Sequence, residues 1–297
     1  MRILICQNPD AGHERVLPEE LVDRLQRAGH EVDWINLKSR RLNDPGIGKF
    51  DLVVAAGGDG SVGRTARQLL GSAVPIAVLP LGTANNLALI LDAGKHDLLA
   101  RIDEWSIVPF DAGTIEFDRN RDWFFEGFGI GAFAETAAAL TAQDRNGSGE
   151  SSREAELARD IAALCERSRK QTPFEAEVHV DGKVIYASLL MLEVLNIGRL
   201  GPNVELAPGV DPADGLLDVV LVEESGRDLL TKFLAETADG RSVGPPFTAV
   251  RGSKIRVKLQ SAVVAHIDGK TSELPTAAEV NLGIQRHAVR FLGGSSS

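Results

Sequence analysis

The chain has 297 residues, of which 43% are hydrophobic, so it can bury a sizeable core and form two domains. Acidic residues outnumber basic ones by 42 to 32, which gives a formal net charge of −10 and argues against a nucleic-acid partner. No segment reaches the roughly 20 apolar residues of a membrane-spanning helix. We expect Cys6 and Cys165 to be buried free thiols, and the protein to be cytoplasmic.

The first part of the chain alternates strands and helices. Residues 2–6 and 31–37 predict strands, with a helix between them that Gly29 closes. This alternation indicates a parallel, right-handed α/β layer over residues 1–108. A C-terminal strand, 285–294, can return to this domain.

A first glycine turn follows an apolar run within residues 51–60 and contains Gly57, Gly58 and Gly60. We expect these glycines to adopt positive φ and to bring backbone N–H groups close to an anion, while Asp59 holds a divalent cation. A helix beginning at Ser61 would add partial positive charge at the same place. An ordinary βα turn is the alternative, because Gly and Asp dominate both.

A second glycine loop ends the next predicted strand, within residues 75–86. Gly82 and Thr83 lie at its tip, and Asn85 and Asn86 follow. Because neighbouring parallel strands end at one edge of a sheet, we expect both loops to line one crevice.

Three segments, GGDGS (57–61), PLGTANN (80–86) and LAPGVDPADGLLDVVLV (206–222), together resemble the diacylglycerol-kinase catalytic family. That family includes bacterial lipid kinases and sphingosine kinases and shares its nucleotide-binding half with the NAD kinases. The resemblance implies an α/β plus mainly β fold, with an NAD kinase-like parallel domain and an antiparallel β-sandwich. It also implies an enzyme that uses ATP and Mg²⁺ to phosphorylate a lipid alcohol, such as a diacylglycerol.

The second half, 109–284, changes to strands joined by sharp turns, with a hairpin at Asp181 and Gly182, which indicates the antiparallel β-sandwich. Two predicted helices interrupt it, 132–143 and 153–170. We expect the polar stretch between them, 144–152, to be mobile, and the tail 293–297 to be flexible.

The resemblance also implies roles for particular residues. The first loop is expected to bind the ATP phosphates and a metal ion, and the second loop and the end of the first strand are expected to complete the pocket. The expected nucleotide-binding residues are Asn8, Gly57, Gly58, Asp59, Gly60, Ser61, Gly82, Thr83, Asn85 and Asn86. Asp111 falls where the family has another acidic residue of the active site, although a turn Asp that caps a hairpin is the alternative.

A separate Mg²⁺ site is implied in the second domain, at Asp211, Asp214 and Leu216. Oxygen-rich turns suit hard cations such as Mg²⁺. The alternative is an ordinary turn, because Pro, Asp and Gly are the residues that turns require.

The chain departs from the family pattern at two charged positions. Lys270 stands where the family has the Glu that acts as general base, so either the lysine is neutralised by desolvation, or Glu273 or Asp268 takes the proton. Asn86 replaces a carboxylate of the metal network. We therefore keep a catalytically weak or inactive nucleotide- and lipid-binding relative as an alternative, and a kinase of a soluble acceptor as another.

Contacts with lipid and membrane are the least specific expectations. Glu126 could bind a lipid headgroup hydroxyl, although an edge-strand Glu that faces water is the simpler interpretation. Peripheral contact with a membrane would need a basic patch, for which the candidates are Arg40, Arg41, Arg167, Arg169 and Lys170. We prefer to regard these as a solvated loop and helix end. A homodimer is a modest expectation from the family.

Overall fold

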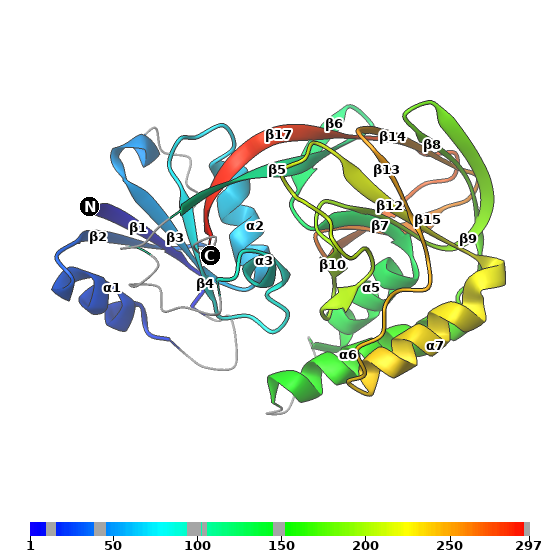
Figure 1. Cartoon of the computed structure of the whole chain (residues 1–297), viewed down its shortest axis with the longest axis horizontal. Helices are drawn as coiled ribbons and strands as arrows, with labels where there is room; N and C mark the ends of the chain where they lie inside the picture. The colour runs from blue at the N-terminus through cyan, green and yellow to red at the C-terminus, as the bar shows by residue number, and fades with distance from the viewer. Residues whose placement is uncertain (10–15, 39–45, 94–101, 103–105, 145–151, 294–297) are drawn as a thin grey trace. The chain divides into compact units, whose positions relative to one another are not determined.

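The computed structural model describes residues 1–9, 16–38, 46–93, 102, 106–144 and 152–293 (Figure 1). Arg40 and Arg41, nearly all of the stretch 144–152 and the tail from residue 294 lie outside the described residues. The chain divides into two compact units, Met1–Asp111 with Arg286–Ser297, and Ala112–Gln285. The division lies close to the boundary near residue 108 that the sequence indicates.

The first unit contains four parallel strands in the order β2, β1, β3, β4: β1 Arg2–Gln7, β2 Glu31–Asn36, β3 Leu52–Gly57 and β4 Ile76–Pro80. The end of the long strand β17, Glu279–Gly293, lies beside β4, where Phe291 pairs with Ile76 in parallel. The unit also contains the helices α1 Pro18–Arg27, α2 Asp59–Gln68 and α3 Asn86–Ile90, and the short helix η1 Ile47–Lys49. The predicted parallel α/β domain is confirmed.

The strands β1 and β3 are apolar along almost their whole length because both of their faces are covered. Leu21 and Leu25 of α1 are buried in one cluster with Ile3 and Ile5 of β1. Helix α2 contacts β3 and β1 and buries Val62 and Ala66. Gly29, just after α1, has φ of 87° and closes the helix as predicted.

Both cysteines are buried and free, as the sequence predicts. Cys6 lies in β1, and burial raises the pKa of its thiol to about 12. Burial also raises the pKa of Cys165, which lies in the helix α6 Arg153–Lys170. Because the thiolate is the reactive form, we expect neither cysteine to react with a disulfide reagent in the native protein at pH 8. Both should react in urea, and native labelling faster than global unfolding would contradict this prediction.

The second unit is built around antiparallel strands in the order β16, β15, β7, β9, β8, β14, β17. Their bounds are β7 Gly127–Gly131, β8 Phe174–Val180, β9 Lys183–Leu195, β14 Lys254–Leu259, β15 Val263–Ile267 and β16 Lys270–Leu274. Two further strands extend from β9, β12 Leu217–Glu223 and β13 Ala249–Gly252, and a hairpin of β5 Ser106–Phe117 and β6 Asn120–Phe124 pairs with β17. Asp181 and Gly182, with φ of 46° and 90°, form the predicted tight hairpin turn.

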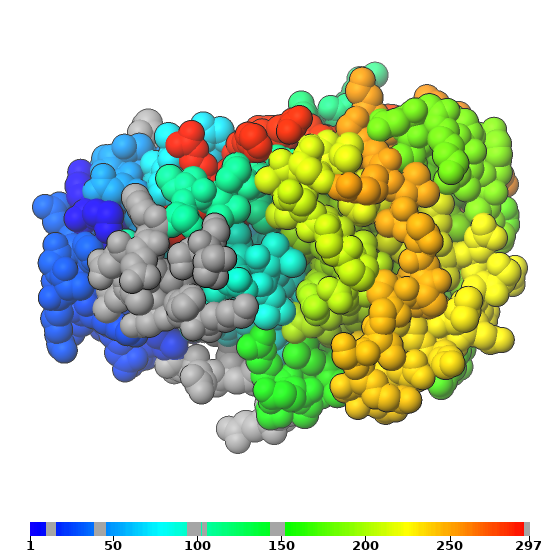
Figure 2. Space-filling view, in the orientation of Figure 1, coloured from blue at the N-terminus to red at the C-terminus, as the bar shows by residue number. Residues whose placement is uncertain are grey.

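Three helices of the second unit pack against a second cluster of apolar side chains: α5 Ala132–Asp144, α6 Arg153–Lys170 and α7 Arg227–Ala238. The short strands β10 Arg199–Leu200 and β11 Val204–Glu205 and the short helix η2 Glu224–Gly226 complete the unit. Helices α6 and α7 lie side by side, and their outer surfaces are visible in Figure 2, coloured green and yellow. The antiparallel, β-rich second half is therefore also confirmed.

Candidate functional site

The two glycine loops meet at the carboxyl edge of β3 and β4, as the sequence predicts. Gly57 pairs with Pro80, and the N–H of Leu81 donates to the Gly57 carbonyl at 3.0 Å. A Cβ atom on Gly82 would lie 2.4 Å from the Gly58 Cα atom. The two loops therefore touch through their backbones, and only glycine fits at this contact.

The backbone of the first loop differs from the prediction. Gly57 has positive φ, at 155°, but Gly58 has φ of −85° and Gly60 is not in the positive region. Helix α2 begins at Asp59 rather than at Ser61, because Gly58 is the N-cap residue, and its carbonyl accepts the N–H groups of Ser61 and Val62 at 2.8 and 3.1 Å. The helix N-terminus therefore lies inside the loop itself.

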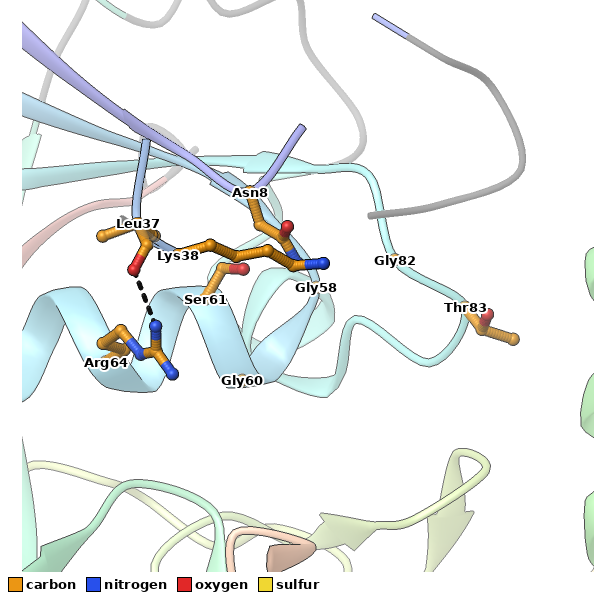
Figure 3. A pocket seen from close by; sticks show the side chains of 9 residues that line it. All are labelled: Asn8, Leu37, Lys38, Gly58, Gly60, Ser61, Arg64, Gly82 and Thr83. Atoms are coloured by element: carbon orange, nitrogen blue, oxygen red, sulfur yellow. Dashed lines mark hydrogen bonds between the residues drawn. The ribbon is translucent and has the colours of Figure 1, made fainter. Parts of the chain in front are cut away.

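A pocket of about 380 Å³ opens at this edge and is within the size range of small-ligand sites. Figure 3 shows its lining residues: Asn8, Leu37, Lys38, Gly58, Gly60, Ser61, Arg64, Gly82 and Thr83. Six of them were expected from the sequence, whereas Leu37, Lys38 and Arg64 were not. Gly57, Asp59, Asn85 and Asn86 were expected but are not among the residues that line it.

Asp59 and Asn85 connect the two loops. The Asp59 carboxylate accepts the N–H groups of Asn86 and Leu87, both at 3.0 Å, at the start of α3. Asn85 adopts the left-handed conformation with φ of 55°. Its side-chain oxygen accepts the N–H of Gly82 at 3.0 Å, and its amide donates to the Gly82 carbonyl at 2.6 Å. An aspartate suits a helix cap as well as a metal ligand, so residue type alone could not separate the two roles.

We expect Asp59→Ala to lower the free energy of unfolding by about 1–2 kcal/mol, because it leaves two N–H groups of α3 without their carboxylate acceptor. Asp59→Asn keeps one acceptor oxygen, so its free energy of unfolding should fall by less than that of Asp59→Ala. Urea unfolding of both variants measures the difference. Equal stability of Asp59→Ala and wild type would show that the carboxylate does not hold the loops together.

Asp111 lies within β5, fully buried, and its Oδ1 accepts the backbone N–H of His287 at 2.6 Å. No hairpin begins at this residue, so the alternative of a turn Asp is wrong. The carboxylate joins β5 to β17 inside the first unit.

Asp268 and Gly269 form the tight turn between β15 and β16, with φ of 46° and 75°. The Asp268 carboxylate accepts three successive backbone N–H groups, those of Phe125, Glu126 and Gly127, at 2.8–3.2 Å. Successive amides of this kind form an anion-binding nest, and here the anion is a side chain of the chain itself.

The other charged residues of this region differ in exposure. Lys270 and Glu273 are exposed on β16, so the burial that would neutralise the lysine is not present. Glu126 is only 5% exposed, so the interpretation of an edge-strand Glu that faces water is wrong. It lies just before β7, and its own backbone N–H is one of the three that the Asp268 carboxylate accepts.

In the segment expected to bind Mg²⁺, Asp211 and Asp214 accept the N–H groups of Ala213 and Leu216, both at 2.9 Å, and so form local turns. The other Asp214 oxygen pairs with the Arg251 guanidinium, which also contacts Asp218 at 3.4 Å. These carboxylates raise the pKa of Arg251, with the Asp214 hydrogen bond as the main cause. In this arrangement the positively charged group beside Asp214 is therefore the Arg251 guanidinium.

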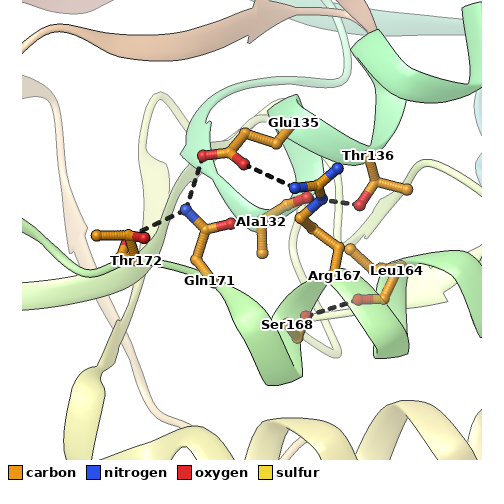
Figure 4. Close-up of polar contacts among 8 residues, drawn as sticks. All are labelled: Ala132, Glu135, Thr136, Leu164, Arg167, Ser168, Gln171 and Thr172. Carbon is orange, nitrogen blue, oxygen red and sulfur yellow. Dashed lines mark hydrogen bonds and ion pairs between the residues drawn. The ribbon is translucent and has the colours of Figure 1, made fainter.

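The basic end of α6 is a solvated helix end, as preferred from the sequence. Arg167 pairs with Glu135 of α5 at 3.4 Å, and the same glutamate accepts a hydrogen bond from Gln171 at 2.8 Å (Figure 4). Arg169 and Lys170 both pair with Glu166. Each of the three cations thus pairs with one of two neighbouring acids, Glu135 and Glu166.

A buried contact between a glutamate and a histidine in the second unit was not expected from the sequence. Glu193 of β9 and His266 of β15 are 0% and 2% exposed, and their side chains meet at 3.0 Å between Oε2 and Nε2. They reach each other across Gly129 of β7, where a Cβ atom would lie 1.9 Å from Glu193 Oε2. Burial raises the pKa of Glu193, and the imidazole of His266 opposes this rise.

The lining of the 380 Å³ pocket fits the phosphate chain of a nucleotide. A Cβ atom on Gly60 would meet nothing within 4 Å apart from its sequence neighbours and the backbone of its own helix, α2 begins at the pocket, and Lys38 and Arg64 are cationic. None of these lining residues is acidic, so they do not form a metal centre by themselves. Among the described residues no group of three or more His, Cys, Asp or Glu side chains could hold a metal ion, and no helix is long and apolar enough to span a membrane.

Comparisons with known proteins cover both halves of the chain. Residues 2–115 match the diacylglycerol kinase catalytic domain, and residues 142–286 match the YegS C-terminal NAD kinase beta sandwich-like domain. A diacylglycerol kinase of Bacillus subtilis is 22% identical over 97% of this chain and 96% of its own length. A probable YegS-like lipid kinase of Pseudomonas aeruginosa is 26% identical over 91% and 88%. The crystal structure of a diacylglycerol kinase from Bacillus anthracis shares the fold, with a TM-score of 0.69, 16% identity, and coverage of 99% and 97%.

Proposed function

Because the chain belongs to the diacylglycerol kinase family, with a diacylglycerol kinase catalytic domain followed by a YegS C-terminal domain, we propose that it is an ATP- and Mg²⁺-dependent lipid kinase. It would transfer the γ-phosphate of ATP to the hydroxyl of a diacylglycerol-like lipid. A cytoplasmic location, peripheral contact with a membrane and a homodimer belong to the same proposal.

One observation carries the proposal, namely the pocket at the touching backbones of Gly58 and Gly82. Phosphoryl transfer depends mostly on positioning the phosphates and stabilising their charge. The start of α2 provides partial positive charge, and Ser61 and Thr83 provide hydroxyl groups at the pocket wall. Mg²⁺ bound with ATP would supply further neutralisation of the phosphates.

The test is transfer of labelled γ-phosphate from ATP to a panel of lipids in mixed micelles. Gly60→Glu places a carboxylate in the open space of the pocket and should reduce transfer at least about tenfold, because it repels and displaces the phosphates. The matched control is Gly48→Glu, since Gly48 also has no neighbour within 4 Å of its Cβ position but lies outside the pocket. No label on any lipid, or equal loss in both variants, would contradict the proposal. Soluble acceptors in the same panel test for a kinase of a soluble alcohol.

A second candidate function is a nucleotide-binding relative with weak or no transferase activity. The observation that favours it is the exposed Lys270 at the position where the family resemblance implies a general base. If a missing base limits turnover, Lys270→Glu should raise it several-fold, whereas the matched Lys270→Gln should not. Nucleotide binding by wild type without transfer in any of the three proteins would favour this second function.

A further inference from the structure

Two cations that the sequence did not single out, Lys38 and Arg64, line the pocket of the first unit. Among the described lining residues they are the charged ones, so the pocket is locally positive although the whole chain has a formal net charge of −10. A positive pocket in an acidic protein concentrates anionic ligands at that place.

The two cations are linked through the backbone. Nη1 of Arg64 donates to the carbonyl of Leu37 at 2.7 Å, and Leu37 directly precedes Lys38. The N–H of Leu37 donates to the Gln7 carbonyl at 2.9 Å, and the N–H of Lys38 donates to Oδ1 of Asn36 at 2.8 Å. The backbone that carries Lys38 is thereby held to both β1 and α2.

The Lys38 side chain extends across Ser61 toward Gly58, and its amine lies on the same side as the Asn8 amide (Figure 3). The ammonium group therefore points toward the first glycine loop, within the pocket that Lys38 and Gly58 both line. The Asp59 carboxylate of the same loop accepts the amides of α3. Lys38 is therefore the side chain placed to balance the charge of an anion in this loop.

We infer that Lys38 binds the phosphate chain of a nucleoside triphosphate in this pocket, and that Arg64 is a positioning residue that holds Lys38 there. The identity of the ligand rests on the proposed function. Because a side-chain cation contacts the phosphates directly, triphosphate binds here without an added divalent cation.

Titration calorimetry with ATP and with inorganic tripolyphosphate, in EDTA at low salt, tests the role of Lys38. Lys38→Met should weaken binding of both ligands about 5- to 10-fold, and added salt should shrink this difference. Lys49→Met is the matched control, because Lys49 is also exposed in the first unit but does not line the pocket. Equal affinity in Lys38→Met and Lys49→Met, or no triphosphate binding by wild type in EDTA, would overturn the inference.

The assay of label transfer separates this inference from the proposed function. Lipid phosphorylation with unchanged triphosphate affinity in Lys38→Met would overturn the role of Lys38 and leave the kinase standing. Lys38-dependent binding of tripolyphosphate without any transfer would support the inference and count against the kinase.

A double-mutant cycle tests the positioning role of Arg64. Arg64→Met should weaken tripolyphosphate binding in the wild-type background, but it should have little further effect once Lys38 is Met. Independent losses that add in the double variant would show that Arg64 binds phosphate itself and would overturn its positioning role. Both side chains are on exposed residues, and circular dichroism of each variant checks that it folds.

Discussion

Gly82→Ala is expected to abolish measurable nucleotide binding and to lower the free energy of unfolding by about 3 kcal/mol. The added Cβ would lie 2.4 Å from the Gly58 Cα atom and 3.0 Å from Oδ1 of Asn85. Since the first of these neighbours is backbone, it cannot rotate away, and the two loops must separate. Urea unfolding and titration with ATP measure the two effects.

The matched control is Gly48→Ala, because a Cβ atom there meets nothing within 4 Å. It should match wild type in nucleotide affinity and change stability by less than about 1 kcal/mol. If Gly82→Ala behaves like this control, the close approach of the loops does not shape the pocket.

His266→Leu is expected to destabilise the protein by about 3–5 kcal/mol at neutral pH, because it leaves the Glu193 carboxylate buried without its partner. Adding Glu193→Gln should restore part of this loss, since the amide carries no charge. A double variant no more stable than His266→Leu would show that lost packing, and not the unpaired charge, causes the effect.

The loss of stability that His266→Leu causes should also grow as the pH rises. Burial raises the pKa of Glu193, so from the usual glutamate range upward the folded state keeps a proton that the unfolded state has released. The free energy of unfolding therefore falls with rising pH until the raised pKa is passed. Without the imidazole that opposes this rise, the fall continues to higher pH. Urea unfolding at several pH values between 5 and 8 measures it, with Glu193→Gln as the variant that lacks this contribution.

The sequence predicted those features that local patterns encode. The alternation of apolar runs with glycine turns predicted the parallel half, and Asp181 with Gly182 predicted a hairpin that the structure confirms. The meeting of the two glycine loops followed from the rule that neighbouring parallel strands end at one edge.

The sequence did not predict the features that depend on contacts between distant segments. Lys38 lies in the turn after β2 and Arg64 in the middle of α2, and no spacing rule brings them to one pocket. Glu193 and His266 are neighbours only because Gly129, on the strand between theirs, has no side chain. The sequence predicts Asp59 as a metal ligand and Asp268 as a possible proton acceptor, but residue type alone does not show that both carboxylates also accept backbone N–H groups.

The position of β17 has a consequence for the order of folding during synthesis. The strand that lies beside β4 in the first unit comes from residues 286–293, and the whole of Ala112–Gln285 is translated before it. During synthesis the edge of β4 therefore has no β17 beside it while the second unit is translated. At typical elongation rates this lasts on the order of ten seconds or more. An exposed strand edge is a template for wrong pairing, so chaperone dependence should be concentrated in the first unit.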